Sequence, residues 1–202
     1  MPGEDLAALT DEQWQAPTLC EEWTVHDVVA HVISYDAVSY RSLTTRIVHG
    51  RFLIDRINEL GVEQHHRCSP DELLSALREH LTPTGFLAMM GGAVGLTDAL
   101  IHHQDIRRPL GLARTVPQER LVMGLKTALF SPTIGGIRRV RDLQLVATDI
   151  DWSFGHGAEV YGTAETLLMA VAGRPTASDL TGPGQPKLAR RVRGLTATNR
   201  PR

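Results

Sequence analysis

The stretch DALIHHQD, residues 98–105, decides how this chain is interpreted, because its polar residues recur at helical spacing. On an α-helix, residues i and i+4 lie one above the other, so Asp98 and His102 can reach the same metal ion. Asp105 lies about one further turn along the same face. A carboxylate and a neutral imidazole suit zinc or another divalent first-row metal. The spacing also fits a simple ion pair on a surface helix, so both interpretations stay open.

A third ligand has to come from elsewhere in the chain, and His31 in VVAHVISYD is the best candidate. Thr24 has the properties of a helix N-cap, and Asp27 is a weaker form of the usual capping-box partner three residues later. From there to about Val48, apolar residues recur at helical spacing, with His31 on the shoulder of the stripe. A single histidine in that place is more often a hydrogen-bonded, half-buried residue than a ligand. The residues alone therefore favour a structural role for His31.

Caps and periodicity predict most of the remaining elements. Ser69 followed by Pro70, Asp71 and Glu72 is a strong helix start, with a cap residue and acids in the first turn. We expect helices at 4–13, 50–61, 70–81, 94–107, 117–130 and 163–172, strands at 142–148 and 150–155, a turn-rich link at 131–139, and a basic tail from 189. This pattern predicts a mainly α protein, with a four-helix bundle over residues 1–130 and a small α/β piece over residues 140–195.

Composition limits the class of protein. The 202 residues are 42% hydrophobic and 22% charged, which is typical of a globular chain, and the formal charge of -2 gives no overall basic field for nucleic acid. Cys20 and Cys68 form no disulfide framework, and they lack the paired spacing of a zinc knuckle. We find no secretory signal and no apolar run long enough for a membrane span. We therefore expect a cytoplasmic protein with no nucleic-acid or membrane partner.

Three further residues near the central stretch have open roles. His102 and His103 are consecutive and point about 100° apart on a helix, so His103 is either a bystander or a neighbour that supports a ligand. Arg107 and Arg108 lie at the predicted helix end, where they complement the helix dipole. They can also bind an anionic substrate, and the sequence does not choose between these roles.

Two separated motifs carry a resemblance to a known family. The first, WxxPTLCxxWTVxDVVAH, runs from Trp14 to His31, and the second, HxQDIRxPLG, runs from His102 to Gly111. Together they resemble the mycothiol-dependent maleylpyruvate isomerase family, which belongs to the DinB-like superfamily of metal-binding four-helix bundles. The resemblance extends more loosely to the C-terminal part, which is similar to the small α/β domain of that family.

The resemblance implies a metal site formed by His31, Asp98 and His102, with zinc as the expected ion. In the family the acid is usually glutamate, whereas aspartate is one methylene shorter. We therefore expect either a closer approach of the helices or an intervening water at Asp98. Asp105 and His103 are then expected to support the ligands, and Arg107 and Arg108 to bind the substrate.

The resemblance also implies thiol-assisted chemistry, with mycothiol as cosubstrate and a small, acidic electrophile as substrate. Characterised relatives catalyse cis–trans isomerisation of an unsaturated keto acid, and related proteins resemble thiol transferases. Two alternatives remain: a metal-dependent hydrolase on the same scaffold, and a non-catalytic binding protein with a degenerate site. The oligomeric state is open, with a homodimer as one option.

Overall fold

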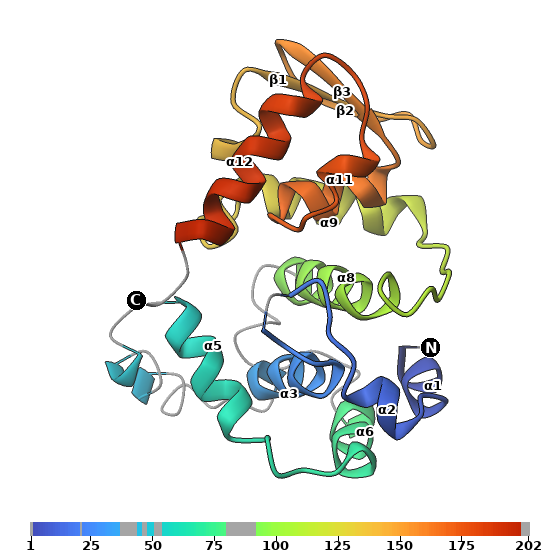
Figure 1. The fold of residues 1–202 in the computed structure, drawn as a ribbon, viewed down its shortest axis with the longest axis vertical. Coiled ribbons are helices and arrows are strands. Elements are labelled where there is room, and N and C mark those ends of the chain that lie inside the picture. Colours follow the sequence, from blue (N-terminus) through green and yellow to red (C-terminus); the bar gives the residue numbers. More distant parts are fainter. Residues whose placement is uncertain are drawn as a thin grey trace. The chain divides into compact units, whose positions relative to one another are not determined.

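The computed structural model describes residues 2–20, 22–36, 44–45, 48–50, 54–79 and 92–198. These residues are mostly helical, and a small three-stranded sheet lies in the C-terminal part (Figure 1). This confirms the predicted mainly α fold with a small α/β piece. The chain divides into two compact units, residues 1–113 and residues 114–202, which we describe one at a time.

The first unit is built from helices around α3. Its helices are α1 (Pro2–Ala7), α2 (Asp11–Trp14), α3 (Val25–Asp36), α5 (Ile54–Glu63), α6 (Pro70–Glu79) and α8 (Ala93–Arg107). Helix α3 contacts α5, α6 and α8. The helix expected over residues 4–13 is two short helices, because Thr10 starts α2 through a capping box with Gln13. Most of the later part of the helix expected to reach Val48 lies outside the described residues. Residues 80–91, between α6 and α8, also lie outside them.

The core of the first unit is the valine stripe of α3. Val25 and Val28 are fully buried, and Ile33 continues the stripe one turn later. They pack with buried residues of the neighbouring helices, Leu73 and Ile106 among them. Valine is a weak helix former, but burial of this stripe and a good N-cap outweigh its propensity. The core therefore fixes which face of α3 is left for His31.

Two reciprocal caps start helices where the sequence predicts them. The Thr24 backbone N–H donates to Asp27 Oδ2 at 3.0 Å, and the Asp27 N–H donates back to Thr24 Oγ1 at 3.2 Å. Ser69 and Glu72 make the same pair of contacts at the start of α6. Each box satisfies backbone donors that a helix start otherwise leaves without partners.

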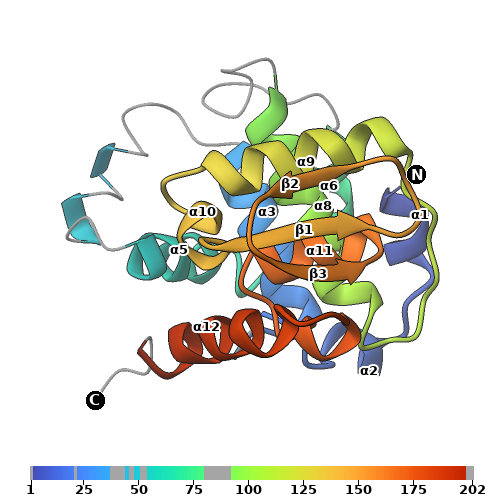
Figure 2. The ribbon, with the colours of Figure 1, turned by 90° about the horizontal axis from the view of Figure 1, so that it is seen from above.

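The second unit combines four helices, a short 3₁₀ turn (Ala177–Asp179) and the sheet. The helices are α9 (Gln118–Phe130), α10 (Gly136–Arg139), α11 (Ala164–Val171) and α12 (Gln185–Thr198), and the strands are β1 (Leu143–Ala147), β2 (Ser153–Gly155) and β3 (Ala158–Gly162). Strand β1 lies between β2, which is antiparallel to it, and β3, which is parallel (Figure 2). Buried Leu145 and Val160 are paired across β1 and β3.

The structure differs from the predicted organisation at two places in this unit. The bundle was expected to extend to residue 130, but α9 packs on α11 and falls within the second unit. The basic tail contains a helix, α12, because Leu188, Ala189 and Val192 supply a buried apolar stripe between the arginines. The Arg191 guanidinium also donates to the backbone oxygen of Arg139 at 2.7 Å.

Membrane insertion finds no support in the helices. Within the described ranges, none of them combines the length and the apolar character that a membrane crossing requires.

The cap of α3 gives a test of the fold. We expect Thr24→Ala to lower the free energy of unfolding by about 1 kcal/mol, because Asp27 and the first turn of α3 lose their hydroxyl partner. Urea denaturation followed by helical circular dichroism measures the loss. Thr24→Ser keeps the hydroxyl and serves as the control. Equal stability of the alanine variant and the wild type would contradict the proposed role of the cap.

Candidate metal centre

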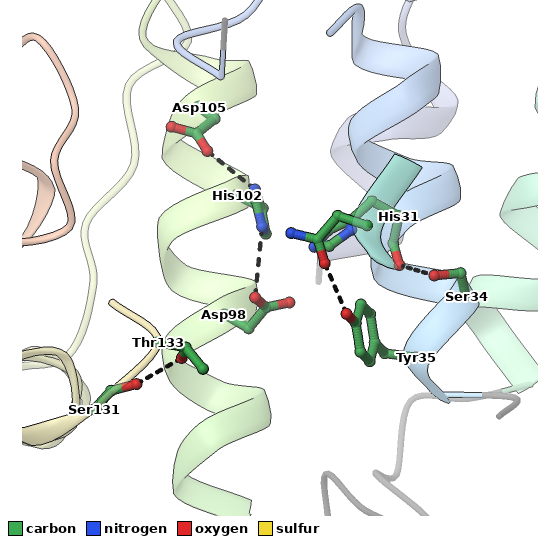
Figure 3. A network of polar contacts seen from close by, with 9 residues as sticks. His31, Ser34, Tyr35, Asp98, His102, Asp105, Ser131 and Thr133 are labelled. Atoms are coloured by element: carbon green, nitrogen blue, oxygen red, sulfur yellow. Dashed lines mark hydrogen bonds and ion pairs between the residues drawn. The ribbon is translucent and has the colours of Figure 1, made fainter. Parts of the chain in front are cut away.

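His31, Asp98 and His102 lie together, although they come from helices far apart in the sequence. One potential ligand atom from each residue lies within 4.8 Å of the other two. Helix α8 presents Asp98 and His102 on one face, and α3 presents His31 opposite them (Figure 3). Both histidines are buried, whereas a third of the Asp98 side chain is exposed. The structure thus brings together the three residues that the family resemblance implies as ligands.

The distance between the two α8 residues suits a shared ion. Nε2 of His102 lies 3.5 Å from Oδ1 of Asp98, which is long for a hydrogen bond. Two ligands of one tetrahedral zinc, each about 2.0–2.1 Å from the ion, are themselves about 3.4 Å apart. The Asp98 carboxylate therefore lies close to Nε2 of His102, the nitrogen that would bind a metal. The N, N, O donor set fits zinc and related first-row metals.

Asp105 fixes the orientation of the His102 ring. Its carboxylate is fully buried, and Oδ2 accepts a hydrogen bond of 3.0 Å from Nδ1 of His102 (Figure 3). Because Nδ1 donates to Asp105, Nε2 is the nitrogen that faces Asp98 and His31, and it can offer a lone pair to an ion once its proton is lost. A carboxylate in this place also makes the imidazole a stronger ligand.

The two carboxylates change the acid–base behaviour of His102. Burial by itself lowers the pKa of His102, but the negative charges and hydrogen bonds of Asp98 and Asp105 outweigh burial and raise the pKa to about 9. The metal-free centre therefore holds a protonated imidazole at neutral pH. A positive charge between two carboxylates is the electrostatic environment that a divalent cation also requires.

Aromatic rings surround His31. The ring centroid of Trp23 lies 4.8 Å from that of His31, and the ring of Tyr35 lies 5.3 Å away at an edge-to-face angle. Tyr35 is held by its hydroxyl, which donates to Oδ1 of Asn58 on α5 at 2.7 Å. Neither Trp23 nor Tyr35 was predicted from the sequence to lie at the site. Trp23 could have been found from the first motif, and Tyr35 from its i+4 spacing to His31.

The loop before α3 is hydrogen-bonded to the backbone of α8. Pro17 and Thr24 form an isolated antiparallel bridge, and the Thr18 N–H donates to the Trp23 carbonyl at 3.1 Å. The Leu19 N–H then donates to the backbone carbonyl of Asp105 at 3.0 Å. The conformation of this loop therefore places Trp23 beside both histidines, 6.4 Å from the His102 ring.

The other predicted site residues make different contacts. Nε2 of His103 lies 4.0 Å from a carboxylate oxygen of Asp5 on α1. Arg107 is buried and donates to Asp5 at 2.7 Å, to the Leu112 carbonyl and to the carbonyl of residue 113. Arg108 is half-buried just after α8. These contacts give Arg107 a structural role, while substrate binding by either arginine stays a prediction.

Comparisons with known proteins agree with this picture. The family model described as the mycothiol maleylpyruvate isomerase N-terminal domain matches residues 3–91, which include His31. A crystal structure of a histidine-to-alanine mutant of the mycothiol-dependent maleylpyruvate isomerase has a TM-score of 0.58 at 14% identity, and that of the mycothiol-dependent maleylpyruvate isomerase itself has 0.52 at 12%. Each alignment covers 91% of this chain and 88% of the other. No curated protein matches the chain.

The two solved structures show the fold alone, because identities of 14% and 12% are too low to transfer a function. The family rests on the N-terminal match and on the first sequence motif, which lies inside it. The model of the mycothiol maleylpyruvate isomerase N-terminal domain family thus matches residues 3–91, which is less than half of the chain.

Proposed function

We propose that this protein is a metal-dependent enzyme that uses the thiol mycothiol to isomerise, or to transfer sulfur to, a small acidic electrophile. The observation that carries this proposal is the cluster of His31, Asp98 and His102, whose candidate ligand atoms lie within 4.8 Å of one another. The N-terminal family match supports the thiol. The oligomeric state and the cytoplasmic location stay predictions from the sequence.

Each residue of the cluster would supply one ligand atom to a bound ion. His31 and Nε2 of His102 would supply two nitrogens, and Asp98 would supply an oxygen, which leaves one position of a tetrahedral ion open. A divalent cation held by these residues would stabilise a bound thiol as its thiolate at neutral pH. Asp105 holds the His102 ring through Nδ1. The rings of Trp23 and Tyr35 cover His31 and keep its surroundings apolar.

The acidic part of the substrate requires a cation. Arg107 already donates to one carboxylate and two backbone carbonyls, so its guanidinium has little left to offer a ligand. These contacts make Arg107 a weaker candidate for binding a substrate carboxylate, and Arg108 stays a candidate.

The two alternative functions use the same cluster. A hydrolase would place water instead of sulfur at the open position of the ion. A non-catalytic protein would bind the metal or a ligand without turnover. The family match favours thiol chemistry over hydrolysis. Metal loading separates both enzymes from a degenerate site that binds no metal, and turnover separates them from a protein that binds the metal without reaction.

Metal content tests the ligand set. After loading with zinc and removal of the excess, we expect roughly one ion per wild-type chain and a loss of most of it in His31→Ala and His102→Ala. Elemental analysis of the desalted protein measures this. His103→Ala is the matched control, because it removes a buried histidine of the same helix that faces Asp5 instead of the cluster. Equal zinc in all four proteins would overturn the ligand assignment.

The affinity for metal should depend on pH. The pKa of His102 is raised from 6.5 to about 9, so an ion at Nε2 must displace a proton below that pH. We expect the zinc affinity to fall about tenfold for each unit of pH between about 9 and 7, with close to one proton released for each ion bound. Calorimetric titrations in buffers of different ionisation enthalpy count the proton. A pH-independent affinity would contradict protonation of His102 in the metal-free centre.

Thiol selectivity tests the cosubstrate. We expect mycothiol at about 100 times its dissociation constant to stabilise the zinc-loaded protein by about 2.7 kcal/mol, and glutathione at the same concentration to stabilise it much less. Thermal unfolding measures the difference, with His102→Ala as the control that lacks the ion. If neither thiol raises the unfolding temperature of the zinc-loaded protein, the thiol part of the proposal fails and the hydrolase alternative gains support.

A further inference from the structure

A second group of potential ligands lies on the other side of the His102 ring. The Sγ of Cys20, a ring nitrogen of His102 and a carboxylate oxygen of Asp105 lie within 4.8 Å of one another. His102 and Asp105 are buried, and Cys20 is half-buried. Only His102 belongs to both groups. Cys20 therefore adds a sulfur donor that the first cluster does not contain.

The backbone around Cys20 is fixed by hydrogen bonds. The N–H of Cys20 donates to Oγ1 of Thr18 at 3.1 Å, and its carbonyl accepts from the Trp23 N–H at 3.1 Å. The neighbouring N–H, that of Leu19, donates to the backbone carbonyl of Asp105 at 3.0 Å. These bonds tie the cysteine to the helix turn that carries the other two ligands. The backbone of Cys20 is thus held beside His102 and Asp105.

Packing against the core accounts for the burial of Cys20, but it does not account for the potential ligand atoms close to its thiol. Both Cys20 and Cys68 lie against the core of the first unit, where a thiol acts as a small apolar group. Among the described residues, Cys68 belongs to no group of three potential ligands, whereas Cys20 does. The two cysteines therefore share a packing environment and differ in their access to a nitrogen and a carboxylate.

We propose that Cys20, His102 and Asp105 form a second metal position, which binds a thiophilic divalent cation such as Cd²⁺. Sulfur, imidazole nitrogen and carboxylate oxygen are all zinc ligands, and the sulfur selects soft cations over hard ones. On binding, bonds form from the ion to Sγ and to Nδ1, and the protons on these two atoms pass to solvent. The ion then takes the place of the hydrogen bond between His102 and Asp105.

The two positions exclude each other. For the first cluster, Nδ1 of His102 donates to Asp105 and Nε2 faces Asp98. For the second position, Nδ1 is itself the ligand, so the hydrogen bond that orients the ring for the first cluster is lost. Cations that prefer nitrogen and oxygen should choose the first cluster, and soft cations the second. This inference does not need the proposed function, because it stands even if His31 binds no ion.

Cadmium is a suitable probe, because a thiolate bound to Cd²⁺ gives a charge-transfer absorption in the ultraviolet that nitrogen and oxygen ligands do not give. We expect Cd²⁺ added to the metal-free, full-length protein to produce this band and to saturate it at roughly one ion per chain. The band should be lost in Cys20→Ser and kept in Cys68→Ser, which is matched in burial class and packing. Circular dichroism confirms that each variant is folded.

Variants of the first cluster separate this proposal from the proposed function. In His31→Ala and Asp98→Asn, Cys20 is intact, and the cadmium band should persist at wild-type intensity. Loss of zinc from His31→Ala together with an unchanged cadmium band supports both proposals. No band in the wild type at saturating Cd²⁺, or a band that survives Cys20→Ser, would overturn the second position whatever the zinc result.

Discussion

The hydrogen bond between Nδ1 of His102 and the buried carboxylate of Asp105 is the contact on which the candidate centre depends. A carboxylate with no exposed surface is costly unless a donor or a positive charge compensates it, and His102 supplies both in the metal-free protein. The same helix turn accepts the Leu19 N–H through the Asp105 carbonyl. One residue of α8 therefore holds the ligand ring through its side chain and the N-terminal loop through its backbone.

Local chemistry made the helices of the first unit predictable. Thr24 with Asp27 and Ser69 with Glu72 start helices at the expected residues, because a cap is a property of four neighbouring residues. The i+4 spacing also placed Asp98 and His102 on one face without knowledge of the fold. His31 could not be placed opposite them in this way, because contact between two separate helices is set by packing. Only the resemblance to a family linked it to α8.

Other features depend on contacts that a local pattern does not contain. The arginines of the C-terminal segment suggested a tail, but its few apolar residues, Leu188 and Val192 among them, form a buried stripe once other elements cover them. Helices α9 and α11 were both predicted to within one residue at each end, whereas their packing against each other was not predicted. The position of Cys20 depends on a turn closed by Thr18, and no spacing to His102 reveals it. In each case the local sequence pattern predicts the element itself but not the element that packs against it.

The two acids of α8 differ in exposure and in the nitrogen of His102 that each one meets. Asp105 is fully buried and hydrogen-bonded to Nδ1 of His102, so it orients the ring. The Asp98 side chain is a third exposed and approaches the same ring from the opposite nitrogen at 3.5 Å. An exposed carboxylate loses little hydration when it moves, so it can adjust by the few tenths of an ångström that coordination demands. The partial exposure of the Asp98 side chain therefore leaves it room to move, which offsets its shorter length compared with glutamate.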